Sequence, residues 1–201
     1  MVFNQPLKSQ DGEIMNSPQY DKALLKSVGD DVFISSAVEI RRPHLVSIGN
    51  HVAIDSGFYL TTALETNDHI HIGPYVSIIG GREGKLTLGR FTNIAAKSTI
   101  ICASDAYLGE GLITAPGVPE EMRDRLVVEP IVFENFANVG ANVTILPGVT
   151  LAEGCVIGAC SFVPRGTKTE PWTIYAGNPI KPIKKRSKEK MLQYAKELGY
   201  L

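Results

Sequence analysis

The sequence predicts an all-β solenoid, in which short parallel strands coil around one continuous apolar core. The main observation is an aliphatic residue at every sixth position, at Val139, Ile145, Leu151, Ile157 and Val163. An amphipathic helix needs apolar residues three and four apart, and a half-buried strand needs strict alternation. A step of six satisfies neither pattern, but it fits one short strand plus one turn. The 19 glycines of the chain suit many tight turns.

The same step recurs upstream in blocks that short insertions separate, and it is lost after residue 100 until Val132. The in-register aliphatics of these blocks are Val28, Ile34, Ile40, Ile48, Ile54, Leu60, Ile72, Ile78, Leu88, Ile94 and Ile100. A second inward position is expected two residues before the repeat aliphatics of the last block, where the residues are small or β-branched: Val143, Val149, Cys155 and Ser161. Three steps of six close one triangular coil, and stacked coils pair as parallel strands about 4.8 Å apart.

The chain before the coils, residues 1–27, is predicted to be an extension with one short helix. Ser17 suits the N-cap, Pro18 suits the first helical position, and Gly29 stands just past the expected end. The extension starts with "MVFNQPLKSQDGEIMNS", which lacks a basic start followed by an apolar run, so no signal peptide is expected. We expect the extension to cover the open edge of the first coil.

The coils are predicted to span residues 28–186, with one long interruption at residues 102–130. The interruption contains glycine, proline and alternating charge, but no repeat. Loops of this length in a compact domain are usually functional or disordered. In a smooth prism, such an excursion is the place where we expect a substrate pocket.

The last segment, residues 187–201, is predicted to be a C-terminal helix with Ser187 as its N-cap. We expect this helix to cap or brace the coils. Its apolar residues fall on one side at helical spacing: Met191, Leu192, Ala195 and Leu198.

Composition argues against several classes of protein. The net charge of −1 gives no indication of a nucleic-acid partner. No stretch approaches the ~20 apolar residues of a membrane span, so we expect a cytoplasmic protein without one. The three cysteines, Cys102, Cys155 and Cys160, have no metal or redox spacing and are expected to be buried thiols.

The repeats "IGNHVA", "IGPYVS", "VGANVT", "ILPGVT", "LAEGCV" and "IGACSF" resemble those of the hexapeptide-repeat acyltransferases. The ending "IYAGNPIKPIKKR" is similar to the closing motif of the coenzyme-A-dependent sugar acetyltransferases in that family. The resemblance covers residues 28–186. It implies a left-handed parallel β-helix and an acyl-coenzyme-A-dependent sugar acyltransferase that takes acetyl-coenzyme A as donor and needs no metal.

The resemblance also implies a homotrimer with active sites between the chains. Flat faces of a prism are suited to burial against a partner. We expect aromatic residues on these faces to take part: Phe58, Tyr59, Phe133 and Phe136.

In the family, a histidine at the start of the long loop accepts the proton of the acceptor. The four histidines of this chain all precede residue 72, and the alignment puts Asp105 in that place. The resemblance also implies acceptor contacts at Tyr107, Glu110 and Glu83. Two other interpretations remain open, namely that Asp105 only caps the loop and that Glu83 is a solvated turn charge.

A carboxylate is a much weaker base than imidazole, so it is poorly suited to deprotonating a sugar hydroxyl. A neutral amine is already nucleophilic and loses its proton easily after attack. The aspartate therefore favours acetyl transfer to the amino group of a nucleotide-linked amino sugar. The first alternative is O-acetyl transfer to a polysaccharide or small glycoside, as in O-antigen or other polysaccharide biosynthesis. The second is a catalytically silent β-helix that serves assembly.

The resemblance assigns coenzyme A to corners of the coils. Its pantetheine arm is expected at Gly140, Ala141, Gly158 and Ala159. Its phosphates need cations, and the closing motif and its surroundings supply them: Arg165, Lys168, Lys181, Lys184, Lys185 and Arg186. A solvated basic tail is the alternative interpretation.

A zinc-dependent γ-type carbonic anhydrase shares the family fold and was weighed as a further alternative. Such a site needs three histidines from neighbouring coils and chains. No histidine follows His71, so the sequence gives this alternative little support.

Overall fold

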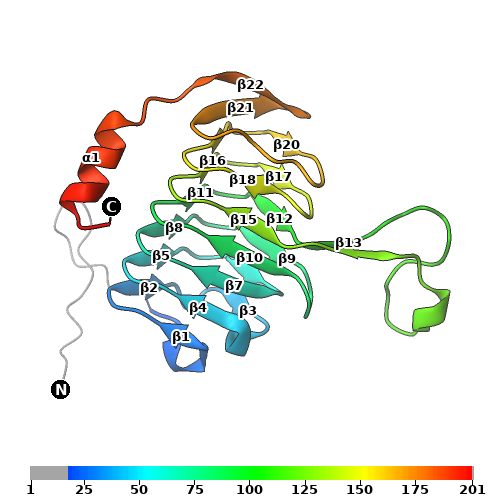
Figure 1. Ribbon diagram of the computed structural model, residues 1–201. Helices are drawn as coiled ribbons and strands as arrows, with labels where there is room; N and C mark the ends of the chain where they lie inside the picture. The colour runs from blue at the N-terminus through cyan, green and yellow to red at the C-terminus, as the bar shows by residue number, and fades with distance from the viewer. Residues whose placement is uncertain (1–17, 201) are drawn as a thin grey trace.

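The computed structural model describes residues 18–200, and most of this chain is a prism of three parallel sheets (Figure 1). Each coil adds one strand to sheet 1, then one to sheet 2, then one to sheet 3. Sheet 1 comprises β1 (Ser27–Val28), β4 (Val46–Ile48), β7 (Ala63–Thr66), β10 (Lys85–Leu88), β15 (Ile131–Phe133) and β18 (Thr150–Leu151).

Sheet 2 comprises β2 (Val32–Ile34), β5 (Val52–Ile54), β8 (Ile70–Ile72), β11 (Asn93–Ile94), β16 (Asn138–Val139), β19 (Val156–Ile157), β21 (Thr173–Gly177) and β22 (Ile180–Lys185). Sheet 3 comprises β3 (Glu39–Ile40), β6 (Tyr59–Leu60), β9 (Ser77–Ile79), β12 (Thr99–Ile101), β17 (Thr144–Ile145) and β20 (Phe162–Val163). All pairs within these sheets are parallel except β21 with β22.

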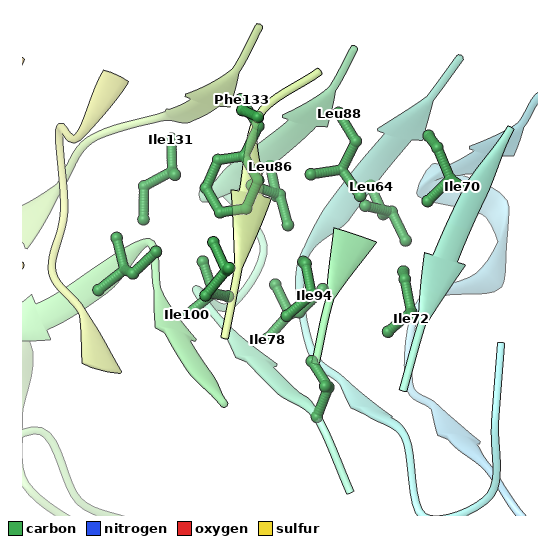
Figure 2. Close-up of a cluster of buried hydrophobic side chains, with 14 of the residues drawn as sticks. Leu64, Ile70, Ile72, Ile78, Leu86, Leu88, Ile94, Ile100, Ile131 and Phe133 are labelled. Carbon is green, nitrogen blue, oxygen red and sulfur yellow. The ribbon is translucent and has the colours of Figure 1, made fainter. Parts of the chain in front are cut away.

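The core is the continuous apolar column that the step of six predicts (Figure 2). Ile94 pairs in register with Val139, and Val139 with Ile157, so each aliphatic lies on its counterpart in the next coil. The second inward positions are also buried: Val143, Val149, Cys155 and Ser161. The predicted parallel β-helix is therefore confirmed.

Two repeat positions were assigned wrongly. Val28 is 39% exposed, because β1 is the edge strand of sheet 1. Val132 points outward, since its neighbours Ile131 and Phe133 fill the interior instead. Strand residues alternate between the two faces, so a shift of one position reverses the assignment.

The aromatic residues expected on the outer faces mostly belong to the interior. Phe58 and Phe133 are each 1% exposed within the core, and Phe136 is buried at a corner. Tyr59 remains half-exposed, with the Arg41 guanidinium 5.3 Å from its ring centroid. Phe58, Phe133 and Phe136 are therefore not available to a partner chain.

The N-terminal helix is wrong as predicted for the described residues, and Ser17 lies outside them. Only a 3-10 helix, η1 (Lys22–Leu24), forms before β1. The backbone N–H of Tyr20 donates to the carbonyl of Ile34 at 2.9 Å, so this segment pairs with the open edge of the first coil. Pairing of an exposed strand edge offsets more backbone polarity than one isolated helical turn would.

The C-terminal helix is confirmed as α1 (Glu189–Glu197), with two corrections. Lys188 occupies the N-cap, and the Ser187 hydroxyl instead donates to the Glu189 carboxylate at 2.8 Å. Ala195 is buried against the prism, but Leu198 is 60% exposed because it follows the last helical turn.

The corner between sheets 1 and 2 carries a stack of rings, which we call the ring corner. Consecutive centroids lie 4.7, 4.9, 5.1 and 5.6 Å apart along His51, His69, Phe91, Phe136 and Trp172. The stack is part of the surface on which α1 packs, through Phe136 and Trp172.

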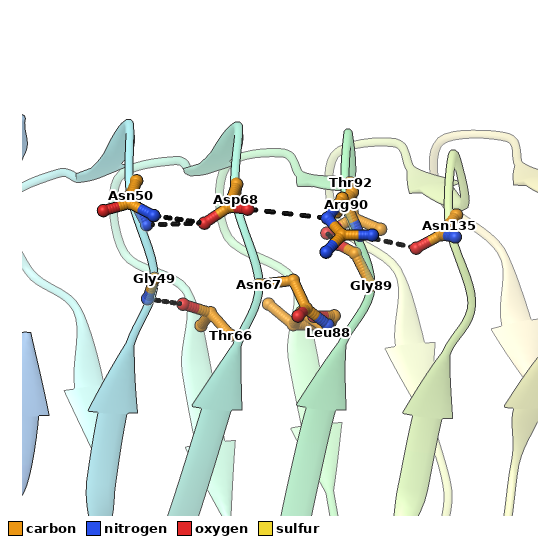
Figure 3. Close-up of polar contacts among 10 residues, drawn as sticks. All are labelled: Gly49, Asn50, Thr66, Asn67, Asp68, Leu88, Gly89, Arg90, Thr92 and Asn135. Atoms are coloured by element: carbon orange, nitrogen blue, oxygen red, sulfur yellow. Dashed lines mark hydrogen bonds and ion pairs between the residues drawn. The ribbon is translucent and has the colours of Figure 1, made fainter. Parts of the chain in front are cut away.

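A polar ladder runs beside the ring corner (Figure 3). The Asp68 carboxylate accepts from the backbone and side-chain nitrogens of Asn50 at 2.8 and 2.9 Å. The backbone N–H of Arg90 donates to the side-chain oxygen of Asn135 at 2.8 Å. These bonds satisfy corner N–H groups that strand pairing leaves free.

Candidate active site

The long interruption forms an arm that extends away from the prism (Figure 1). Its stem is an antiparallel pair of strands, β13 (Ala103–Asp105) and β14 (Leu126–Val128). It leaves the prism at the corner between sheets 3 and 1, which we call the arm corner. The remaining 3-10 helices are η2 (Pro43–Leu45) in an earlier coil and η3 (Glu120–Met122) in the arm.

The tip of the arm is ordered around a carboxylate that is only 6% exposed, that of Asp124. One of its oxygens accepts from the backbone N–H groups of Leu108 and Gly109 at 2.7 and 3.1 Å. The other accepts from the N–H of Arg125 at 2.7 Å. Hydrogen bonds to a charged acceptor are the stronger kind, so Asp124 fixes the strand that leaves the stem.

Asp105 ends β13, and its carboxylate is held by one residue of the arm. Thr114 donates its hydroxyl at 2.6 Å to one oxygen and its backbone N–H at 3.1 Å to the other. This contact is the loop cap that the sequence left open as an alternative. Each carboxylate oxygen keeps a further acceptor position, so the cap does not prevent a contact with substrate.

Asp105 lies between two hollows on opposite sides of the stem. The larger one, of about 700 Å³, we call the upstream hollow, since it faces the coil before the arm. The smaller one, of about 370 Å³, faces the coils after the arm, and we call it the downstream hollow. Only three residues line both: Ser104, Asp105 and Tyr107.

The upstream hollow brings together several of the predicted acceptor contacts. Glu83, Asp105 and Tyr107 line it, together with Arg82 and Thr114. The fourth expected residue, Glu110, is exposed on the arm and is not among the residues that line either hollow. Glu83 stands at an exposed turn, as its alternative interpretation requires, but that turn is also a wall of the hollow.

The wall that carries Glu83 is a tight turn between β9 and β10. A Cβ at Gly80 would come within 2.8 Å of the Cys102 Cβ, and one at Gly84 within 2.7 Å of the Thr62 hydroxyl. Thr61 accepts from the N–H of Gly80 at 3.2 Å. Two glycines are thus needed to fold this turn against the coil, and they place Arg82 and Glu83 at the mouth of the hollow.

The downstream hollow has a different character because β14 alternates. Leu126 and Val128 face the upstream side, and Val127 faces the downstream side. Hydrocarbon dominates the downstream walls, with Leu108, Leu146 and Pro147 added to Val127. Arg165 closes one end and is held by a bidentate ion pair with Glu129. This pair lowers the pKa of the Glu129 carboxyl below its ordinary value.

The residues expected to hold pantetheine lie on the corner between sheets 2 and 3, which we call the alanine corner. Gly140 and Gly158 are needed for the stacking of coils. A Cβ on Gly140 would come within 2.6 Å of the Ala159 nitrogen, and one on Gly158 within 3.0 Å of the Ala176 Cβ. Among the hydrogen bonds between described residues, the N–H groups of Ala141 and Ala159 donate none. These groups fit the amide carbonyls of an extended arm.

The six basic residues expected to bind the phosphates are not brought together. Arg165 lies at the arm corner, and Lys168 bridges to Thr150 on sheet 1. Lys181 lies in β22 opposite Ala176, next to the alanine corner.

The other three basic residues follow β22 away from the alanine corner. Lys184 lies opposite Ile174 and is exposed. Lys185 is engaged by the Glu170 carboxylate at 2.8 Å. Arg186 donates to the carbonyls of Phe136 and Gly154 at 2.9 and 3.1 Å, and burial lowers the pKa of its guanidinium. Arg186 therefore pins the ring corner, and a phosphate site is best supported at Lys181 and Lys184.

Two cysteines are buried thiols as expected, and one is not. Burial raises the pKa of Cys102 to about 12 and that of Cys155 to about 11. Cys160 is exposed, because it occupies a left-handed turn position with φ of 58°. Within residues 18–200, no cluster of three or more His, Cys, Asp or Glu side chains has a metal-binding arrangement. No helix in this part of the chain is long and apolar enough to cross a membrane.

Sequence reasoning missed three residues of the site: Thr114, Asp124 and Arg82. Asp124 has a local signal, since it stands between two arginines in the arm and still has to be buried. Thr114 has none, because it lies nine residues from Asp105 in a stretch without periodicity. Arg82 was visible beside Glu83, but only the folded turn places it at the hollow.

No model of a known protein family matches the chain. Two curated proteins from Escherichia coli are similar to it. The dTDP-4-amino-4,6-dideoxy-D-glucose acyltransferase is 34% identical over 167 residues, which is 82% of this chain and 84% of the relative. The putative lipopolysaccharide biosynthesis O-acetyl transferase WbbJ of strain K12 is 33% identical over 135 residues, which is 67% of this chain and 63% of the relative.

Solved structures give the same result. AntD, an N-acyltransferase from Bacillus cereus, matches with a TM-score of 0.82 and 27% identity over 93% of this chain and 100% of AntD, in a complex with dTDP-4-amino-4,6-dideoxyglucose and coenzyme A. A hexapeptide-repeat acetyltransferase of Vibrio cholerae, VCA0836, has a TM-score of 0.54 and 19% identity over 83% of this chain and 77% of its own, and shows the fold alone. With its coil, its closing motif and a 34% identical acyltransferase relative, the chain belongs to the hexapeptide-repeat acyltransferase family.

Proposed function

We propose that the protein transfers an acetyl group from acetyl-coenzyme A to the amino group of a nucleotide-linked amino sugar. The observation that carries this proposal is the position of Asp105, whose carboxylate lines both hollows of the arm corner. An acceptor in one hollow and a thioester in the other would meet at this carboxylate.

The chemistry suits a carboxylate that orients rather than one that abstracts a proton. The neutral amine attacks the thioester carbonyl, and a C–N bond forms as the carbonyl becomes tetrahedral. The C–S bond then breaks, and the proton lost from nitrogen ends on the departing sulfur, so an amide and a free thiol result. Asp105 accepts a hydrogen bond from the amine and holds it for attack.

The acceptor class is supported by the relatives and by the upstream hollow. The Escherichia coli relative and AntD are named for, or bound to, a dTDP-linked 4-amino sugar. Polar groups line the upstream hollow: the Glu83 carboxylate and the Tyr107 phenol suit sugar hydroxyls, and the Arg82 guanidinium suits a diphosphate. The protein would then modify an activated sugar for a surface polysaccharide, in the cytoplasm where acetyl-coenzyme A is made.

The donor is supported by the alanine corner and by a second complex of AntD, which holds 3-hydroxybutyryl-coenzyme A. Ala141 and Ala159 offer free N–H groups to the pantetheine arm. Lys181 and Lys184 offer cations to the phosphates. Arg186 has no such role in this proposal, because carbonyls of the ring corner already take its donors.

We also propose that three chains assemble with the sites between them. The arm extends from the prism and exposes large apolar side chains, which are 60, 57, 59 and 54% exposed at Leu108, Leu112, Ile113 and Met122. Such an arm suits the face of a neighbouring copy. A stable monomer in light scattering would contradict the assembly.

O-acetyl transfer to a sugar hydroxyl is the second candidate, because WbbJ is named as an O-acetyl transferase. The two candidates are separated by free-thiol release from acetyl-coenzyme A. The acceptor panel pairs dTDP-4-amino-4,6-dideoxyglucose with its 4-hydroxy counterpart. The proposal expects release with the amine and only background release with the hydroxyl compound. The reverse preference would replace it by O-acetyl transfer.

A further inference from the structure

We propose that the downstream hollow is an acyl-chain pocket, which gives the enzyme a preference for thioesters with chains longer than acetyl. The inference rests on the proposed function, because it assigns the donor side of that reaction. It names residues for donor selectivity: Leu146 on the prism, with Leu108 and Val127 on the arm.

Position is the first argument. The hollow starts at Asp105 and continues along the stem toward the coils that carry the alanine corner. An acyl carbon attacked beside Asp105 would therefore direct its chain into this hollow, since the acceptor occupies the opposite side of the stem.

The second argument is the chemistry of the walls. Val127 is 8% exposed, and Pro147 is buried beside it. Leu146 and Leu108 supply the other hydrocarbon surfaces. The cation at the end, Arg165, is already neutralised by its bidentate pair with Glu129. A pocket of this kind binds a short uncharged chain better than a carboxylate.

The third argument is size. The hollow of about 370 Å³ is roughly twelve times the ~30 Å³ share of one water molecule in the liquid. An acetyl methyl group would leave most of this space to water, whereas a four-carbon chain would contact Val127 and Leu146. Burial of each added methylene strengthens binding by about fourfold, so two should give at least about tenfold.

Calorimetric titration of the full-length protein with acetyl-coenzyme A and butyryl-coenzyme A tests this pocket without any acceptor. We expect butyryl-coenzyme A to bind about tenfold more tightly. In Leu146→Phe, which narrows the hollow, the ratio of the two affinities should fall to about one or below. Leu146→Ile, which keeps the volume, should preserve the ratio.

Two further variants keep the test independent of folding at Leu146. Leu108→Trp narrows the hollow from the arm, where the side chain is 60% exposed and a larger ring is tolerated. Ile79→Phe enlarges a wall of the upstream hollow and should leave the ratio of donor affinities unchanged.

An affinity ratio of one or less in the unaltered protein would overturn the inference. So would a ratio that neither Leu146→Phe nor Leu108→Trp changes. Failure of the proposed function has a different signature: both thioesters bind with the expected ratio, and no amino sugar is acylated.

Discussion

The carboxylate of Asp105 accepts two hydrogen bonds from Thr114, one from its hydroxyl at 2.6 Å and one from its backbone N–H at 3.1 Å. This contact ties the end of the stem to the far side of the arm, so one residue both closes the loop and orients the carboxylate. Thr114 also lines the upstream hollow. The carboxylate that replaces a histidine in this family is thus held in one orientation.

Replacing Thr114 by valine should lower kcat by about threefold to tenfold, since one of the two bonds that orient Asp105 is lost. The backbone donor remains, so the arm should still close. Thr114→Ser restores the hydroxyl and should recover most of the activity. Steady-state kinetics with acetyl-coenzyme A and the amino sugar measure both variants. If the serine variant is as impaired as the valine variant, the hydroxyl does not position Asp105.

Asp105→Asn should reduce kcat by about tenfold if the carboxylate orients an amine. A general base for a hydroxyl would be worth roughly 10²–10⁴. The pH profile of the variant should still follow deprotonation of the substrate amine. Full activity in Asp105→Asn would remove both roles and leave only the loop cap.

The double variant Lys181→Ala, Lys184→Ala should raise the KM for acetyl-coenzyme A by tenfold or more, with little change in kcat. Each lost phosphate contact costs about 1–3 kcal/mol. Lys190→Ala, an exposed lysine on α1, serves as the matched control for loss of charge. An unchanged KM in the double variant would place the phosphates elsewhere.

The ring corner should make stability depend on pH. Burial lowers the pKa of His69 from its ordinary value of 6.5, and the neighbouring His51 lowers it further. The unfolded chain therefore binds a proton that the folded chain resists, and stability is lost as pH falls below about 6.5. The melting temperature of the parent should drop between about pH 7.5 and pH 5.5.

His69→Phe continues the stack with a ring that does not titrate, so its melting temperature should drop less over the same range. His44→Phe, at an exposed histidine, should keep the dependence of the parent. Equal drops in the His69 variant and the parent would show that other groups control acid sensitivity.

Much of the fold could be predicted, because a step of six is a property of the whole coil. Val139, Ile145 and Leu151 lie inside, as spacing alone required. The edges could not be predicted in this way. Pro18–Val28 carries helix signals but pairs with the first coil, since its environment is an open strand edge that no local pattern reports.

The site was predicted in part. Asp105, Tyr107 and Glu83 meet at one hollow because a coil count aligned them with positions that stack. The basic residues scatter, since each step of six moves the chain to another face, and Arg165, Lys168 and Lys181 fall on successive faces. The bonds of Thr114 and Asp124 depend on how the arm closes on itself, which no periodic pattern determines.

The most direct test of the account is the chemical identity of the product. The protein is incubated with acetyl-coenzyme A and dTDP-4-amino-4,6-dideoxyglucose, and the sugar nucleotide is analysed by mass spectrometry before and after treatment with alkaline hydroxylamine. We predict the mass of one added acetyl group that survives the treatment, because an amide resists hydroxylamine. An acetyl group removed by hydroxylamine, or no acetylated sugar beside bound and intact acetyl-coenzyme A, would contradict transfer to the amine.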